Sequence, residues 1–290
     1  MKHMVVVHRT VERRSGKKEI MRIGMCQKDL RGPFGETLEW IASHGYDGFQ
    51  VWQREMHEAG LNATQVLSMA TSLGLEVTAV GGGPNLVDPR TSRHVVDQFR
   101  WFLDLSVELG CRIVTAESKA QPDDISSDYA WDTIAEIAAE ICTHAEDVGA
   151  VLAIECSNSS FIADQDDWHE LYRRVGSNSL KVNFDPANFA LAGRDPVEAV
   201  DSLADHIVHT HAKDVVRCSG EGGNAEDPGI RDVPAGEGIV GYASYMSALA
   251  RAGYDGYLTV EMHPGNSPRL EEAAKAVQKL RTIIEAEGIA

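Results

Sequence analysis

The apolar positions of this chain recur in short runs, separated by longer stretches in which apolar and polar residues mix. From Met21 onward, eight runs of about four to six residues, rich in Val and Ile, repeat along the chain. Runs of this length, bounded by turn residues, are typical of strands buried on both faces of a parallel sheet. The predicted strands are Arg22–Cys26, Gly48–Trp52, Glu76–Val80, Cys111–Thr115, Val151–Glu155, Leu180–Asp185, His206–His211 and Tyr257–Glu261.

Between these runs, apolar residues return at helical spacing. Residues 36–44, 127–148 and 268–286 carry the clearest examples, with Ile134, Ile137 and Ile141 on one face of the second. Glycine follows many of these stretches, as in His44-Gly45-Tyr46. Glycine is the residue that most readily adopts the left-handed conformation that ends a helix. The pattern therefore predicts helices that end just before the next strand.

Eight strand-then-helix units in one chain predict a closed parallel barrel. The main alternative is an open doubly wound sheet, which usually carries a glycine-rich phosphate-binding turn after its first strand. Here Cys26-Gln27-Lys28-Asp29 occupies that position, and Gly81-Gly82-Gly83 lacks the required spacing and meets Pro84. We expect this triple glycine to be a loop at the mouth of the barrel. The predicted fold is a single (β/α)8 TIM barrel over residues 21–290, with residues 1–20 as a short N-terminal extension.

Composition narrows the class of protein. The 290 residues include 27 Lys plus Arg against 44 Asp plus Glu, a formal charge of −17, which argues against a nucleic-acid partner. Five scattered cysteines form no disulfide framework, and no apolar run has the length of a membrane helix. The N-terminal basic residues follow a short apolar run, the reverse of a signal peptide. We expect a cytoplasmic protein with no membrane partner.

The last four predicted strands each end on a side chain that can bind a metal ion. These residues are Glu155, Asp185, His211 and Glu261. Because reactive groups of a parallel barrel gather at the carboxyl ends of its strands, we expect the four to converge. Three carboxylates and one imidazole suit a divalent ion such as Mn²⁺, Mg²⁺, Co²⁺ or Zn²⁺. Strand alternation places Ala153, Asn183, His209 and Thr259 one layer deeper on the same inward face.

Several motifs resemble the xylose isomerase-like barrel superfamily, which includes sugar phosphate isomerases, ketose 3-epimerases, inosose isomerases and dehydratases, and endonuclease IV. The resemblance covers about residues 21–286. It implies that the four strand-end residues hold one divalent ion, with manganese favoured. It also implies that Glu155 and Glu261 exchange a proton with the carbon beside a carbonyl, as base and acid. The matching segments are Leu152–Glu155, Val182–Asn188, His209–Asp214, Pro234–Gly238, Gly253–Gly256 and Val260–Glu261.

Six further residues are candidate substrate contacts, several of them with a structural alternative. Arg217 and Lys213 follow His211, where a cation could bind a substrate oxygen or form a salt bridge. His263 lies two residues past Glu261, and Asn188 occupies a position where relatives often carry histidine. Glu117 follows the fourth strand and is equally compatible with a solvated loop. Trp52 ends the second strand and could form an apolar wall against a sugar ring or pack in the core.

Departures from the superfamily patterns separate its branches. Endonuclease IV needs three zinc ions, and the additional histidines for them are absent from this sequence. We therefore expect a single-metal isomerase or epimerase that acts on a small sugar, keto-sugar or polyol. The alternatives are a lyase or dehydratase acting on an inosose or 3-keto-glycoside at the same site, and a non-catalytic sugar-binding barrel. Relatives commonly form oligomers, so a homodimer or homotetramer is expected.

Overall fold

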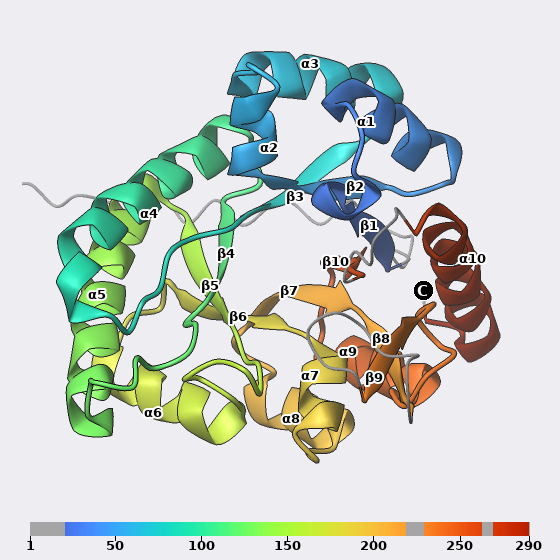
Figure 1. The fold of residues 1–290 in the computed structure, drawn as a ribbon. Helices are drawn as coiled ribbons and strands as arrows, with labels where there is room; N and C mark the ends of the chain where they lie inside the picture. The colour runs from blue at the N-terminus through green and yellow to red at the C-terminus, as the bar shows by residue number, and fades with distance from the viewer. Residues whose placement is uncertain (1–20, 219–228, 263–268, 290) are drawn as a thin grey trace, which may run out of the picture.

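The predicted barrel is confirmed. The computed structural model describes residues 21–218, 229–262 and 269–289, and its strands close in the order β1-β10-β7-β6-β5-β4-β3-β2 with every pairing parallel (Figure 1). The barrel strands are β1 (Arg22–Cys26), β2 (Gly48–Trp52), β3 (Glu76–Gly81), β4 (Ile113–Glu117), β5 (Val151–Glu155), β6 (Leu180–Phe184), β7 (Ile207–Ala212) and β10 (Tyr257–Val260). The proposed N-terminal extension, residues 1–20, lies outside the described residues.

Helices surround the barrel, as Figure 1 shows. The three helices expected over 36–44, 127–148 and 268–286 are α1 (Phe34–Ser43), α5 (Ser127–Val148) and α10 (Leu270–Glu287). Their buried faces carry the apolar residues that the periodicity selected, such as Ile134, Ile137 and Ile141 of α5. The other helices are α2 (Gln53–Glu58), α3 (Ala63–Leu73), α4 (Ser92–Glu108), α6 (Gln165–Val175), α7 (Pro186–Leu191), α8 (Pro196–Leu203) and α9 (Tyr242–Arg251), with short 3-10 turns η1 (Gln27–Leu30) and η2 (Pro89–Thr91).

The fourth strand begins two residues later than predicted. Gly110 and Arg112 both have positive φ angles, of 78° and 59°, and the Arg112 amide bonds back to the carbonyl of Ser106. The turn after α4 therefore continues through Arg112, because a left-handed residue cannot belong to an extended strand. The strand also ends two residues later than predicted, so Glu117 is the last residue of β4 rather than part of the following loop. It pairs with Glu155 across the β4–β5 ladder.

Beyond β7, the chain forms a small antiparallel ribbon that the sequence pattern did not predict. Strands β8 (Asp214–Arg217) and β9 (Ile230–Val233) pair outside the barrel sheet. Asp214 lies at its base and is buried, and its carboxylate accepts four backbone N–H groups, from Val215, Gly236, Gly238 and Val240. The aspartate thus ties the Gly-Glu-Gly segment to the end of β7. A Cβ at Gly238 would lie 2.2 Å from Oδ1 of Asp214, so this close approach requires glycine.

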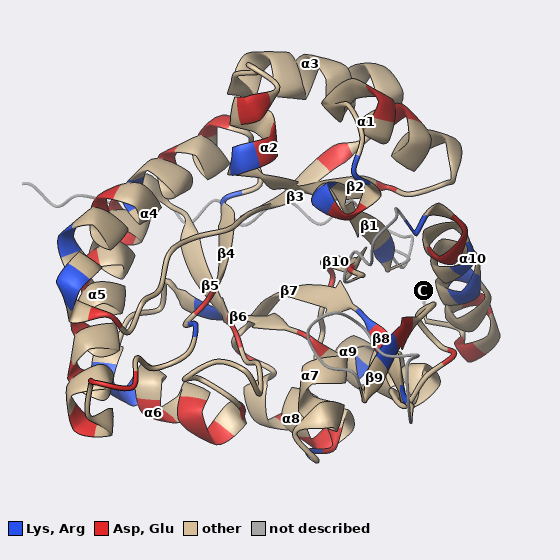
Figure 2. Ribbon diagram, viewed as in Figure 1, with Lys and Arg blue, Asp and Glu red and all other residues tan. Residues whose placement is uncertain are grey.

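Charged residues lie mainly on the outer helices and near the strand ends, with both signs interspersed (Figure 2). Among the described residues, every helix is too short or too polar to cross a membrane. The described cysteines are all free thiols, as expected from their scattered spacing.

Candidate active site

The four residues expected to bind a metal converge at the carboxyl end of the barrel. Glu155 ends β5, Asp185 caps α7 directly after β6, His211 lies on β7 and Glu261 follows β10. One ligand atom from each lies within 4.8 Å of the others. Two ligands on opposite sides of an ion, each about 2.1 Å from it, are about 4.2 Å apart, so the cluster is close to the size of a coordination sphere. Its three carboxylates and one imidazole suit a hard or borderline divalent ion.

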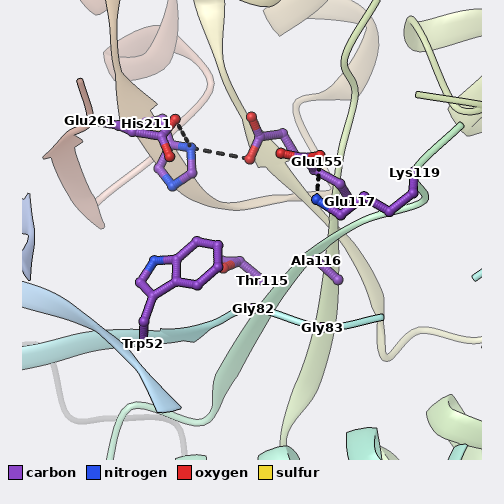
Figure 3. A pocket seen from close by; sticks show the side chains of 10 residues that line it. All are labelled: Trp52, Gly82, Gly83, Thr115, Ala116, Glu117, Lys119, Glu155, His211 and Glu261. Carbon is purple, nitrogen blue, oxygen red and sulfur yellow. Dashed lines mark hydrogen bonds and ion pairs between the residues drawn. The ribbon is translucent and has the colours of Figure 1, made fainter. Parts of the chain in front are cut away.

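His211 stands between the two glutamates. Its Nδ1 lies 3.1 Å from Oε2 of Glu155 and 3.3 Å from Oε2 of Glu261 (Figure 3). On the opposite edge of the ring, Nε2 lies 2.9 Å from Oε1 of Gln50, which is an acceptor. Gln50 in turn donates to Oγ1 of Thr115 at 2.7 Å. This arrangement places a hydrogen on Nε2, so Nδ1, which faces the two carboxylates, is the nitrogen that an ion would bind in place of its proton.

Beneath the cluster lies a buried polar layer, at the positions that strand alternation predicted. Asn183 donates to Oε2 of Glu155 at 2.8 Å and accepts from Nδ1 of His209 at 2.8 Å. Nε2 of His209 accepts a hydrogen bond from Thr259 at 3.0 Å. Burial, followed by the nearby His211, lowers the pKa of His209 well below its usual value. The side chains of this layer are therefore uncharged, and the amide of Asn183 orients Glu155 by a hydrogen bond.

The ligand carboxylates also contact a buried lysine. Nζ of Lys213 lies 2.6 Å from Oδ2 of Asp185 and 3.6 Å from Oε2 of Glu261, and the lysine side chain is 4% exposed. Oδ2 of Asp185 is buried, and no donor in the described part of the chain meets it in hydrogen-bond geometry, although it forms the ion pair with Lys213. A buried carboxylate oxygen without a hydrogen bond fits a metal ligand. The residues present therefore fit a divalent ion.

Burial and charge act against each other on these groups. Burial alone would raise the pKa of Glu261, but His211, Lys28 and Lys213 together hold it well below its usual value. Burial alone would lower the pKa of His211, yet Glu261 and Glu155 raise it well above its ordinary range. The glutamates and the imidazole therefore favour each other's charged forms, as expected for opposite charges held close in a buried site.

A cavity opens beside the cluster (Figure 3). Glu155, His211 and Glu261 line it together with Trp52, Thr115, Ala116, Glu117, Lys119, Gly82 and Gly83. Gly82 and Gly83 have φ angles of 120° and 138°, and a Cβ at Gly83 would lie 2.4 Å from the ring of Phe99. Gly81 is the last residue of β3, so the expected loop at the barrel mouth begins only at Gly82, and Gly82 and Gly83 line the cavity.

The six predicted substrate contacts fall into different places. Trp52 and Glu117 line the cavity, where Glu117 is paired with Lys119 at 2.8 Å. Asn188 is buried behind Glu155 and donates to its Oε1 at 2.9 Å. Lys213 contacts the ligand carboxylates, and Arg217 is exposed on β8 and is not among the residues that line the cavity. His263 lies outside the described residues.

Sequence reasoning missed two residues of the site, Lys28 and Asp29. They lie in η1, directly after β1, and so at the same end of the barrel as the four ligand candidates. Nζ of Lys28 is 2.6 Å from Oδ1 of Asp29 and 3.4 Å from Oε1 of Glu261. The sequence feature that could have identified them is their position directly after the first predicted strand, where residues at the barrel mouth are expected.

Comparison with known proteins gives several relatives over most of the chain. Fructoselysine 3-epimerase from Escherichia coli O157:H7 is 23% identical over 272 residues, which cover 88% of this chain and 94% of the epimerase. Inosose dehydratase from Lacticaseibacillus casei is 23% identical over 164 residues, about half of each chain, at 53% and 55%.

Solved structures share the fold. A D-tagatose 3-epimerase-like protein aligns with a TM-score of 0.77 at 20% identity, over 92% of this chain and 98% of its own. A 3-keto-D-glucoside 4-epimerase from E. coli aligns with a TM-score of 0.74 at 18% identity, over 90% and 99%. Residues 38–283 match the sequence family described as the xylose isomerase-like TIM barrel. The chain therefore belongs to the xylose isomerase-like TIM barrel family.

Proposed function

We propose that this protein is a metal-dependent isomerase or epimerase of a small sugar, keto-sugar or polyol. The observation that carries the proposal is the position of Glu155 and Glu261, on either side of Nδ1 of His211 at the edge of an open cavity. The sugar epimerases among the relatives support this class of reaction.

In this proposal Glu155, Asp185, His211 and Glu261 hold one divalent ion, with manganese favoured. When bound, the ion supplies positive charge that polarises a carbonyl and an adjacent hydroxyl group. One glutamate takes the proton from the carbon beside the carbonyl, and the other returns a proton to give the product. The substrate passes through an enediolate, whose negative charge lies close to the cations of the site.

The two glutamates differ in their polar neighbours: amide groups surround Glu155, and ammonium groups lie beside Glu261. Both oxygens of Glu155 accept hydrogen bonds from amide groups, from Asn183 on Oε2 and from Asn188 on Oε1. Glu261 instead faces ammonium groups, with Lys213 on the side of Oε2 and Lys28 on the side of Oε1. Trp52 offers an apolar ring at the cavity wall, and Glu117 and Lys119 offer polar groups for sugar hydroxyls.

A lyase is the second candidate, because inosose dehydratases are among the relatives. The same proton abstraction would then lead to loss of a β-hydroxyl group as water. Product analysis distinguishes the two reactions, since an epimerase incorporates solvent deuterium without loss of mass as water, whereas a dehydratase releases water.

The first test is metal content, followed by exchange. Protein purified without chelator should contain about one divalent ion per chain, and H211A should lose it. Wild-type protein incubated in D₂O with free ketohexoses and an inosose should transfer deuterium to at least one of them. E155Q and E261Q should each reduce that rate about 10²- to 10⁴-fold.

The exposed substitution E285Q on α10 is the matched control and should leave exchange unchanged. Failure of both glutamine variants to reduce exchange by more than about tenfold would contradict the two-glutamate mechanism. Tight binding of a sugar in the presence of a chelator, with no exchange of any substrate, would favour a non-catalytic sugar-binding barrel.

A further inference from the structure

Two side chains of the η1 turn contact neighbouring residues after β10, the side chain of Glu261 and the backbone N–H of Met262. Oδ2 of Asp29 accepts the backbone N–H of Met262 at 3.0 Å, directly after Glu261. Nζ of Lys28 lies 3.4 Å from Oε1 of Glu261 and 2.6 Å from the other oxygen of Asp29. Asp29 is 3% exposed, so its carboxylate is a fixed buried anchor for the lysine. Closure of the barrel between β1 and β10 brings these segments together.

The two oxygens of Glu261 face different surroundings. Oε2 faces the ligand cluster, with Nδ1 of His211 at 3.3 Å and Nζ of Lys213 at 3.6 Å. Oε1 faces Lys28, whose side chain is 20% exposed. The Lys28 ammonium also lies 4.9 Å from the ring centroid of Trp52, a residue of the cavity wall. Lys28 is therefore located between the ring of Trp52 and the glutamate oxygen that does not face the cluster, in an adjoining hollow that it lines with Asp29, Arg31, Gly32, Arg54 and Glu55.

We propose that Lys28 is a substrate-contacting residue that determines specificity, donating a hydrogen bond to an uncharged sugar oxygen beside Oε1 of Glu261. An ammonium group has three donors. Two of them face Asp29 and Glu261, and the third can bind a hydroxyl or carbonyl oxygen of a sugar that rests on Trp52. The proposal rests on the proposed sugar isomerase or epimerase function and adds a residue and a preference to it.

The charges around Lys28 determine whether it binds a neutral or a negatively charged oxygen of the substrate. Asp29 and Glu261 already supply two carboxylates to this one ammonium group. A substrate carboxylate or phosphate at the same place would add a third negative charge within a few ångströms, which is unfavourable in a partly buried site. A neutral oxygen gains the hydrogen bond without this repulsion, so Lys28 selects a free sugar over a sugar acid at this position.

The test compares K28M and K28R with K275M, an exposed control on α10. Methionine keeps the apolar stem against Trp52 but removes the donors, whereas arginine keeps the charge and the donors. Two measurements are made on each variant. The first is kcat and KM for deuterium exchange into the ketohexose that wild type processes best, with a keto-aldonate of the same length in parallel. The second is the dissociation constant of a hexitol, which offers hydroxyls but cannot form an enediolate.

For K28M we expect kcat/KM on the ketohexose to fall about 10- to 100-fold and hexitol binding to weaken about 10-fold or more. On a logarithmic scale, K28R should recover at least half of the kcat/KM that K28M loses. The metal content should remain one ion per chain in both variants. The wild type should prefer the ketohexose to the keto-aldonate, and K275M should match it. The recovery by arginine separates a donor role from simple packing, because methionine preserves the packing.

Three results would overturn the proposal: K28M within twofold of wild type in exchange and hexitol binding, no recovery in K28R, or a preference for the keto-aldonate. A different result would show that the proposed function itself is wrong. If wild type exchanges no ketose while K28M still weakens hexitol binding tenfold, the contact is supported and the proposed reaction is refuted.

Discussion

Replacement of Asp214 by Asn tests whether one buried carboxylate holds the segment after β9 against the end of β7. The carboxylate accepts N–H groups from Gly236 and Gly238 on Oδ2, at 3.0 and 2.7 Å, and from Val215 and Val240 on Oδ1, at 3.0 and 3.1 Å. Asparagine retains one acceptor oxygen, but its NH₂ group cannot accept. Two of the four hydrogen bonds are therefore lost, and two buried N–H groups face another donor.

The expected cost follows from these contacts. A hydrogen bond to a charged group contributes about 1.5–3 kcal/mol, so the loss of two, offset in part by relaxation, amounts to about 3 kcal/mol. For a single domain of this size, that corresponds to a decrease of about 5 °C in the midpoint of thermal unfolding. The lost hydrogen bonds lie in one segment, so the amides of Gly236, Gly238 and Val240 should also exchange with solvent faster than in wild type.

Calorimetry and hydrogen exchange followed by mass spectrometry make the two measurements. D123N, at an exposed aspartate in the segment before α5, is the matched control and should leave both unchanged. A midpoint for D214N within 2 °C of wild type, with normal protection of residues 236–240, would refute the reasoning. Loss of protection across the whole barrel would equally show that Asp214 does not act locally.

Three further predictions concern the site and its supports. Asn188→Ala removes the donor to Oε1 of Glu155 and should reduce kcat of the proposed reaction about tenfold with metal content unchanged, as measured by exchange and elemental analysis. Gly83→Ala should destabilise the protein by about 2 kcal/mol or more in urea unfolding, because its φ is 138° and a Cβ would overlap Phe99. Burial lowers the pKa of His209, so its imidazole should remain neutral with hydrogen on Nδ1 in nitrogen-15 NMR at pH 6; its contribution to stability is present above about pH 6.5 and is lost as the pH falls below that value. A charged His209 in the folded protein at pH 6 would contradict this account.

The errors of the sequence reading have local physical causes. Cys111 and Arg112 were assigned to β4 because Cys111 extends the apolar run, whereas the left-handed backbone of Arg112 delays the strand. Strands β8 and β9 have four residues each, which is too short for alternation to be recognised. Their pairing also depends on Asp214, three of whose four hydrogen bonds join segments more than twenty residues apart in the chain.

The sequence by itself determined the barrel, most of its strand boundaries and the four residues that converge at its carboxyl end. It could do so because strand burial and helix periodicity are local properties, and because equivalent positions after parallel strands meet at the same end of a barrel. Only the tertiary structure decided that Lys28 and Asp29 act on Glu261, 233 residues later in the chain. That contact exists because the barrel closes β1 against β10, and nothing in the local pattern of either segment encodes the distance between them.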